Sequence, residues 1–387
     1  MSLTVSSTPQ GFSTFITNLG IRDTTDDFVF IQSSVPCVAD GVFTQSLFAG
    51  PSVTISRDNL KDSQAQAIVV ISKNANVANG SVGIADAQEV LQLVAAETGI
   101  AAHNIVIAST GVIGRRYPIE KIQAGLLGFG KKLTDADFYA AARGIMTTDT
   151  VAKLATRQIG NAKLVGIAKG VGMIEPNMAT LLTFFFTDAA ISANSLRSIF
   201  RSTIDKTFNC LSVDTDTSTS DSAVILANGI AGEVSEADFA SALQEVAQEL
   251  VLKIARDAEG ATKIIEVTVD SAINYAQAKT VAKAIVNSPL VKTAVYGADP
   301  NWGRVAMAIG KCENEQQINQ DKVVISFDNV KVYPSSLTEE NLEQLRQIMS
   351  KDKVDIHVSL NIGEASATVW GCDLSEGYIE INGKYST

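Results

Sequence analysis

Residues 169–182 read Lys-Gly-Val-Gly-Met-Ile-Glu-Pro-Asn-Met-Ala-Thr-Leu-Leu, a glycine-rich turn that runs into an apolar segment. Glycine lets the backbone bend sharply or approach a ligand closely, and Pro176 biases the residue before it toward extended conformations. The apolar segment 181–186 predicts a buried strand that Thr180 opens. Threonine is common at the start of a strand. Here its hydroxyl stands where an irregular polar turn meets a rigid element, which suits a reactive group.

The rest of the chain predicts strands and helices without a strict βαβ rhythm. Apolar runs predict strands at 28–32, 41–46, 67–72, 104–109, 162–169, 180–188, 223–227, 263–270, 323–327, 355–360, 365–370 and 378–381. Apolar residues at helical spacing predict helices at 84–98, 135–146 (capped by Thr134), 193–208, 235–255 and 338–349, and one that starts at Pro118. We therefore expect an α/β fold in the broad sense (mixed α+β), with mixed sheets flanked by helices and a smaller unit beyond about residue 280.

Composition restricts the class of protein. The chain has 387 residues, 46% of them hydrophobic and 19% charged, which predicts a globular protein with a sizeable core. The net charge of −11 disfavours nucleic acid as a partner, because the phosphate backbone is also negative. No secretion signal, bilayer-spanning run or basic amphipathic face is evident, so we expect a cytoplasmic protein without a membrane partner. Four scattered cysteines predict reduced thiols rather than a zinc or redox site.

Several common motifs are incomplete in this chain. Residues 125–131 have the outline of a phosphate-binding loop, but Lys132 stands where a metal-binding Ser or Thr is required. The acidic run that starts at Asp214 lacks the glycine and the final glutamate of a calcium loop. His103 and His357 are the only histidines, which argues against a Ser-His-Asp triad and a histidine metal cage.

The stretch from Lys169 to Thr180 resembles the self-cleavage motif of the ornithine acetyltransferase (glutamate N-acetyltransferase) family. The resemblance implies that the chain is cut between Ala179 and Thr180, which makes Thr180 the N-terminal nucleophile of a second chain. A threonine hydroxyl needs a base to attack an acyl carbon. A free α-amino group has a pKa of roughly 7.7–8 and can be that base near neutral pH. The cut would therefore supply what a chain poor in histidine lacks.

The same resemblance assigns an oxyanion hole and two substrate contacts. Thr110 and Gly111, in Ser-Thr-Gly-Val-Ile-Gly, match the family's hydroxyl and backbone N–H donors to the oxyanion. By position alone, Thr-Gly after a strand is an ordinary turn. Lys169 matches a charge partner for the substrate's α-carboxylate, although by itself it could be a surface lysine. Either Thr147 or Thr148 matches a substrate-contacting threonine, and the sequence does not say which.

Three further positions carry over from the family. Glu259, in Asp-Ala-Glu-Gly-Ala-Thr-Lys, matches a carboxylate suited to the δ-ammonium of ornithine, although Ala258 replaces the usual glycine. Asn382 and Thr387 match a closing Asn and Thr that reach the substrate. Thr387 is the last residue, so a frayed terminus is the alternative interpretation.

The resemblance covers nearly the whole chain, including the segments 41–44, 217–221, 299–304 and 370–374. One loop departs from the family pattern. The common Asn-Ser-Gly-Asn-Ala-Asn-Ala is replaced by Ile-Ser-Lys-Asn-Ala-Asn-Val at 71–77. That loop and Phe-Ala-Gly-Pro at 48–51 resemble the branch associated with clavulanic-acid-type clusters rather than the arginine-pathway mainstream.

Taken together, the resemblance implies an autoproteolytic acyltransferase with an N-terminal threonine nucleophile. It would pass acetyl from N2-acetyl-L-ornithine to L-glutamate by a ping-pong acyl-enzyme on Thr180, without a metal or an organic cofactor. Residues 1–179 and 180–387 would be its α and β chains in an α2β2 heterotetramer. Within the β chain, 180–280 would complete the catalytic core and 281–387 would form the smaller lobe. The alternatives are a self-cleaving aminopeptidase or amidase that uses water as acceptor, and a binding protein that keeps the fold without activity.

Overall fold

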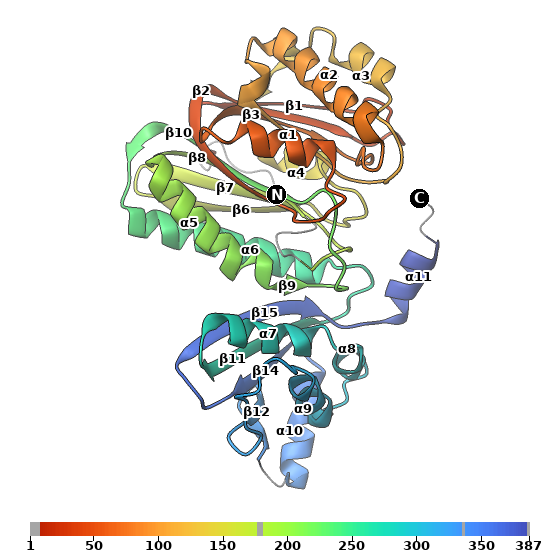
Figure 1. The fold of residues 1–387 in the computed structure, drawn as a ribbon, viewed down its shortest axis with the longest axis vertical. Coiled ribbons are helices and arrows are strands. Elements are labelled where there is room, and N and C mark those ends of the chain that lie inside the picture. The colour runs from red at the N-terminus through yellow and green to blue at the C-terminus, as the bar shows by residue number, and fades with distance from the viewer. Residues whose placement is uncertain (1–7, 176–180, 335–336, 385–387) are drawn as a thin grey trace.

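The computed structural model describes residues 8–175, 181–334 and 337–384 (Figure 1). The described residues build two β-sheets, one of nine strands and one of six. In Figure 1 the nine-stranded sheet, with its helices, fills the upper two thirds of the molecule and the six-stranded sheet lies below it. The last helix, α11 (Glu376–Lys384), stands to one side and points back up toward the larger sheet (Figure 1).

The larger sheet has the order β4-β3-β2-β10-β8-β7-β6, with β1 paired to β2 and β5 paired to β1. Its strands are β1 (Phe12–Thr17), β2 (Phe28–Phe43), β3 (Gln64–Ile71), β4 (Ile105–Ser109), β5 (Thr134–Asp135), β6 (Lys153–Ile159), β7 (Ala162–Lys169), β8 (Leu182–Ala190) and β10 (Ser222–Glu233). The helices around it are α1 (Pro51–Asn59), α2 (Gly80–Thr98), α3 (Ile119–Leu126), α4 (Phe138–Gly144), α5 (Ala193–Lys206) and α6 (Glu236–Arg256).

Alternating side chains explain why this sheet folds back on itself. On β2, Phe28 and Phe30 join the core under α2 and α3, whereas Val29 and Ile31 point to the other face. Side chains of β7, β8 and β10 meet Val29 and Ile31 in one shared core, and Phe185 on the opposite face of β8 packs against α5 and α6. Because successive residues of a strand face opposite sides, two sheet halves with apolar faces stack between outer helices. The result is an αββα sandwich.

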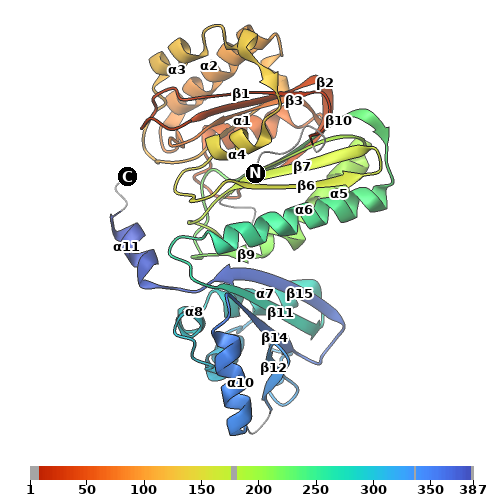
Figure 2. The ribbon, with the colours of Figure 1, turned by 180° about the vertical axis from the view of Figure 1, so that it is seen from behind.

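The smaller sheet has the order β13-β12-β14-β11-β15-β9. Its strands are β9 (Leu211–Ser212), β11 (Ile264–Ala272), β12 (Val324–Phe327), β13 (Val330–Tyr333), β14 (Lys353–Ser359) and β15 (Ala365–Cys372), and its helices are α7 (Tyr275–Val286), α8 (Pro289–Tyr296), α9 (Trp302–Gly310) and α10 (Glu339–Met349). The rear view shows α6 lying between β6 and this sheet (Figure 2). One apolar core therefore continues from β7 through α6 to β11 and β15.

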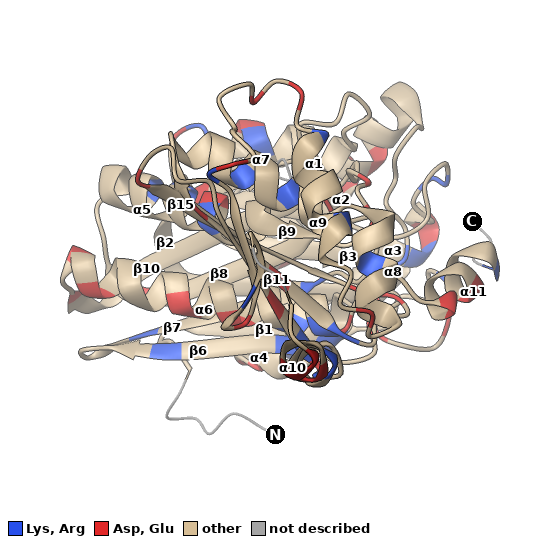
Figure 3. Cartoon of the chain, turned by 90° about the horizontal axis from the view of Figure 1, so that it is seen from below, with Lys and Arg blue, Asp and Glu red and all other residues tan. Residues whose placement is uncertain are grey.

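Two features of the structure concern the membrane and nucleic-acid partners considered above: the length and polarity of the helices, and the distribution of charged residues. Among the described residues, every helix is too short or too polar to cross a bilayer. Acidic and basic residues are interspersed along the chain in the view from below (Figure 3).

Most predicted elements are confirmed, and three are corrected. The strands predicted at 28–32 and 41–46 are one strand, β2, which loses its pairing with β3 around Pro36 because proline has no N–H to donate. Thr134 lies in β5, and the cap of α4 is Asp137, whose Oδ1 accepts from Ala140 N at 2.9 Å. The strand predicted at 378–381 is part of α11; none of the residues of that helix is buried, so a short apolar run misled the prediction.

Candidate active site

The site starts at the end of β7, where Lys169 lies beside the start of β8. The strands pair with Lys169 opposite Leu182. The Lys169 side chain is almost fully buried, and its Nζ donates to Thr147 Oγ1 at 2.8 Å and to Thr110 Oγ1 at 3.3 Å. Burial lowers the pKa of Lys169, although the nearby Asp149 carboxylate opposes the shift. One lysine thus brings two predicted site residues to a single point.

The Thr110–Gly111 turn follows β4 and is held against the segment after β3. Thr110 N donates to Ile71 O at 3.0 Å, and Val112 N donates to Lys73 O at 3.4 Å. Gly111 has φ of +125°, and a Cβ there would lie 2.2 Å from the carbonyl carbon of Lys73. Only glycine fits this position, because any side chain would clash and strain the backbone. The turn keeps the Gly111 N–H at a fixed place next to the Thr110 hydroxyl.

Glu259 approaches from the loop after α6 and is held at three atoms. Its N donates to Val171 O at 2.8 Å, its Oε1 accepts from Thr148 Oγ1 at 2.9 Å, and its Oε2 accepts from Asn382 Nδ2 at 3.0 Å. Gly172 makes room for this carboxylate, since a Cβ there would lie 2.3 Å from Glu259 Oε2. Helix α11 is thereby connected to the site through Asn382.

A cavity of about 150 Å³ unites these groups. The predicted site residues that line it are Thr110, Gly111, Thr147, Thr148, Lys169, Glu259 and Asn382. Both threonines face it: Thr147 accepts from Lys169, and Thr148 donates to Glu259. The other predicted positions, Ala179, Thr180 and Thr387, lie outside the described residues.

A buried ion network that the sequence did not reveal supports the cavity from below. Asp149 Oδ1 accepts from Lys153 Nζ at 2.7 Å and from Gly170 N at 2.8 Å, and its Oδ2 accepts from Thr147 N at 3.2 Å. Lys153 also donates to Asp257 Oδ2 at 2.5 Å. Burial alone would raise the pKa of Asp149, but Lys169 and Lys153 hold it below its ordinary value. The only sign of this network in the sequence is that Asp149 directly follows Thr147 and Thr148.

The acidic run that superficially resembles a calcium loop holds the glycine-rich turn instead. The two carboxylate oxygens of Asp214 accept from Met173 N and Ile174 N, both at 2.7 Å. Asp221, at the end of that run, is buried beside Leu181, and burial raises its pKa well above the ordinary value. Among the described residues no group of three or more His, Cys, Asp or Glu side chains is placed to hold a metal ion.

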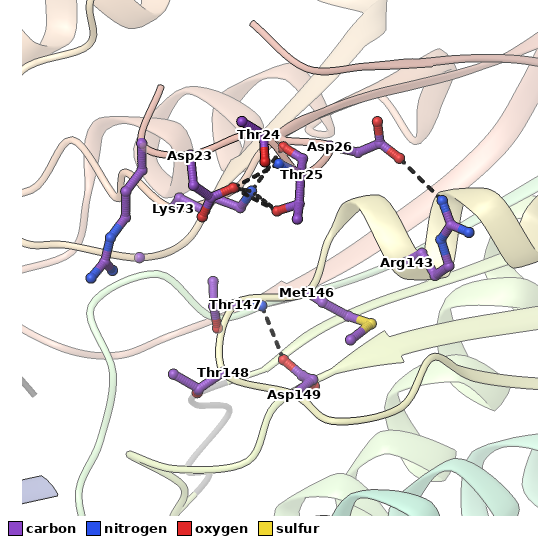
Figure 4. Close-up of a pocket in the computed structure, with 12 residues that line it drawn as sticks. Asp23, Thr24, Thr25, Asp26, Lys73, Arg143, Met146, Thr147, Thr148 and Asp149 are labelled. Carbon is purple, nitrogen blue, oxygen red and sulfur yellow. Dashed lines mark hydrogen bonds and ion pairs between the residues drawn. The ribbon is translucent and has the colours of Figure 1, made fainter. Parts of the chain in front are cut away.

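A second and larger chamber, of about 550 Å³, adjoins the cavity (Figure 4). Its wall is made by the loop 22–26, Lys73, and the segment from Arg143 to Asp149, and it shares Gly111, Thr147 and Thr148 with the smaller cavity. Figure 4 shows Thr147 and Thr148 on one side of the chamber and the Asp23–Lys73 pair across from them.

Lys73 belongs to the loop that departs from the family pattern, and it adopts a left-handed φ of 72°. Its Nζ donates to Asp23 Oδ1 at 2.6 Å, to Thr25 O at 2.9 Å, and to the Thr25 hydroxyl. The hydrogen bond from Lys73 to the Asp23 carboxylate is the main reason that the pKa of Asp23 lies far below its usual value. The lysine therefore fixes the loop 23–25 as the outer wall of the chamber.

Comparisons with known proteins agree with the resemblance. The model of the ArgJ family matches residues 13–387. The chain is 83% identical over all 387 residues, and over the whole of both chains, to a protein of Nostoc sp. called "Arginine biosynthesis bifunctional protein ArgJ 2". It is 49% identical, again over the whole of both chains, to "Glutamate N-acetyltransferase Oat2" of Streptomyces clavuligerus. The crystal structure of an ArgJ protein from Bacillus halodurans is 40% identical and covers 51% of this chain and 96% of its own, with a TM-score of 0.48. Matched by the family model over nearly its full length, the chain belongs to the ArgJ family.

Proposed function

We propose that this protein is a glutamate N-acetyltransferase that moves an acetyl group from N2-acetyl-L-ornithine to L-glutamate. The observation that carries the proposal is the charge arrangement of the smaller cavity. Lys169 and Glu259 line the same 150 Å³ space, each held by a threonine hydroxyl, with the Thr110–Gly111 turn also in its wall. Acetyl-ornithine carries an α-carboxylate, a δ-ammonium and an acyl carbonyl, which are complementary to these three features.

In this proposal Thr180 carries the acetyl group. Its free α-amino group takes the hydroxyl proton, Oγ1 attacks the acetyl carbon, and the oxyanion accepts hydrogen bonds from Thr110 Oγ1 and Gly111 N. The bond from carbon to the ornithine α-nitrogen breaks, and that nitrogen leaves with the proton. Glutamate then attacks the ester with its α-amine and restores the threonine hydroxyl. Lys169 binds the α-carboxylate, Glu259 binds the δ-ammonium, and Thr147, Thr148, Asn382 and Thr387 complete the substrate contacts.

The assembly is part of the same proposal. Cleavage between Ala179 and Thr180 yields an α chain, 1–179, and a β chain, 180–387, which form an α2β2 heterotetramer in the cytoplasm. We place the rest of the catalytic core in 180–280, since β8 and β10 lie between β2 and β7 in the larger sheet. We place the smaller lobe in 281–387, to whose sheet β9 and β11 from 180–280 also belong. The reaction as written uses neither a metal nor an organic cofactor.

Acyl transfer from acetyl-ornithine, measured with and without glutamate, tests the proposed reaction. We expect ornithine release to continue only while glutamate is present, after a single burst of acylation. Thr180→Ala should remain one chain and should lose this activity, whereas Thr293→Ala, on the exposed face of α8, should be cut and active. Steady release of acetate without glutamate would show that water is the acceptor and would favour the hydrolase alternative.

A further inference from the structure

The volume of the larger chamber is far greater than that of an acetyl group. The chamber has a volume of about 550 Å³, against about 150 Å³ for the cavity that the amino-acid contacts line. One molecule of liquid water takes up about 30 Å³, so an acetyl group would fill only a small part of the chamber. Binding sites gain affinity by excluding water from apolar surface and by matching polar groups. A chamber left mostly to solvent would gain little of either.

The wall between the two spaces carries the oxyanion donor. Gly111 lines both spaces, and a carbonyl oxygen bound by its N–H would lie at that wall. The two substituents of an amide carbonyl diverge from the carbonyl carbon, so one can extend into each space. Lys169 and Glu259, the proposed amino-acid contacts, line only the smaller cavity. The larger chamber is left for the acyl substituent.

We propose that the larger chamber is an acyl-group site and that the enzyme accepts N2-acyl-ornithines whose acyl chain is longer than acetyl and ends in a carboxylate. The inference rests on the proposed acyl transfer and names a wider class of donor for it. The same bonds form and break as with acetyl: Thr180 Oγ1 gains the acyl carbon, the ornithine nitrogen leaves with the proton, and glutamate receives the acyl group.

Arg143, at the end of α4, is the group suited to the far end of such a chain. Its side chain is 58% exposed and donates to Asp26 Oδ2 at a long 3.4 Å. A guanidinium has five N–H donors and binds carboxylates in pairs of hydrogen bonds. Lys73 is not suited to this role, because its three contacts to Asp23 and Thr25 match the three donors of an ammonium group. Arg22 adds a second guanidinium to the lining.

The test compares N2-acetyl-, N2-butyryl- and N2-succinyl-ornithine as donors to the full-length, self-processed enzyme. Ornithine release gives kcat/KM, and the mass of the 180–387 chain reports the acyl-enzyme. We expect acylation by all three donors, with kcat/KM for the succinyl donor at least equal to that for acetyl. Arg143→Gln should lower kcat/KM for the succinyl donor roughly 10- to 100-fold and leave acetyl and butyryl unchanged. Arg346→Gln is the matched control, since Arg346 is 60% exposed and pairs with Glu343 at 3.3 Å on α10.

A second variant tests the volume of the chamber rather than its charge. Thr24 is an exposed residue of the wall loop, and Thr24→Trp should lower kcat/KM for both longer donors while acetyl transfer persists. Acylation by the acetyl donor alone, or an equal effect of Arg143→Gln on all three donors, would overturn the chamber assignment. Transfer from succinyl-ornithine but not from acetyl-ornithine would support the chamber and refute the acetyl donor. Failure of all three donors would refute both proposals.

Discussion

Lys169 shows how a single residue can combine two properties that oppose each other. In the proposed role it needs a positive charge to bind a carboxylate, yet its side chain is buried, and burial disfavours that charge. The charges of Asp149, Asp221 and Glu259 favour the ammonium form. The pKa of Lys169 is nevertheless lowered, so its charge is lost at a lower pH than that of an exposed lysine.

This shift predicts an alkaline limb in substrate binding. As pH rises through the lowered pKa, Lys169 becomes neutral and the substrate α-carboxylate loses its partner, so KM for acetyl-ornithine should rise. Lys169→Met should show a higher KM at every pH and no such limb. Initial rates at saturating glutamate, measured across the alkaline range, check this expectation. A wild-type KM that stays constant up to the ordinary lysine pKa, about 10.4, would contradict it.

A substitution at Gly172 tests the position of the Glu259 carboxylate through substrate binding rather than through folding stability. Gly172→Ala would place a Cβ 2.3 Å from Glu259 Oε2 and push the carboxylate away from Asn382. We expect KM for acetyl-ornithine to rise roughly tenfold or more, as for Glu259→Gln, because a charge-assisted hydrogen bond is lost. Gly310→Ala is the control, since a Cβ added there would meet no atom within 4 Å. Equal KM values in the two alanine variants would rule out this role for Gly172.

Among the secondary-structure elements, the ion network of Asp149, Lys153 and Asp257 connects the start of β6 to the segments around it. Asp149 lies in the segment before β6, Lys153 begins β6, and Asp257 follows α6 on the way to Glu259. Because Asp149 also accepts from Gly170 N, the segment that follows β7 belongs to the same network. Asp149 also binds the backbone of Thr147, which lines the smaller cavity. The shape of that cavity therefore depends on buried charges that do not line it.

Removing the lysine of this network should be costly. Lys153→Met leaves the carboxylates of Asp149 and Asp257 buried without their common partner, and breaking a buried pair typically costs roughly 3–5 kcal/mol. Lys61→Met is the control, because its pair with Asp58 is exposed and worth at most about 1 kcal/mol. Urea unfolding of the two variants measures the difference. Equal losses of stability would show that the network is not what holds these segments.

Most strands of the core were predictable from sequence, but β6 and α7 were not predicted although both bury residues in it. Strands such as β3 and β11 bury at least one face, so their apolar pattern predicts them directly. Helix α11 buries none of its residues, and its short Tyr-Ile-Glu-Ile run fits a strand as well as a helix. The prediction of Thr134 as the cap of α4 is wrong because a two-residue pairing with β1 leaves no pattern in the sequence.

The candidate site was predictable only through resemblance. Thr110, Lys169 and Glu259 are far apart in the chain, and no spacing rule brings them to one cavity. The supporting residues were missed for a physical reason. Asp149 and Lys153 look like surface charges in sequence, since their burial depends on each other and on the fold. The larger chamber left no sequence signal other than the unusual loop that contains Lys73.

At the scale of the whole molecule, the proposed cut divides a sheet rather than two separate bodies. In the larger sheet, β10 and β8 belong to 180–387, while their neighbours β2 and β7 belong to 1–179. The two pieces therefore share a ladder of hydrogen bonds at both edges of this pair and a common apolar core. We expect the cut pieces to co-elute in size-exclusion chromatography and to separate only in denaturant. Separation under native conditions would contradict this expectation.

In the proposed reaction, a threonine freed at its amino group carries the acyl group. Intact mass spectrometry of active protein, before and after mixing with acetyl-ornithine, tests it most directly. We expect two chains, 1–179 and 180–387, with the second heavier by one acetyl group after mixing and returned to its first mass by glutamate. A single unbroken chain of 41.0 kDa with full activity would contradict it.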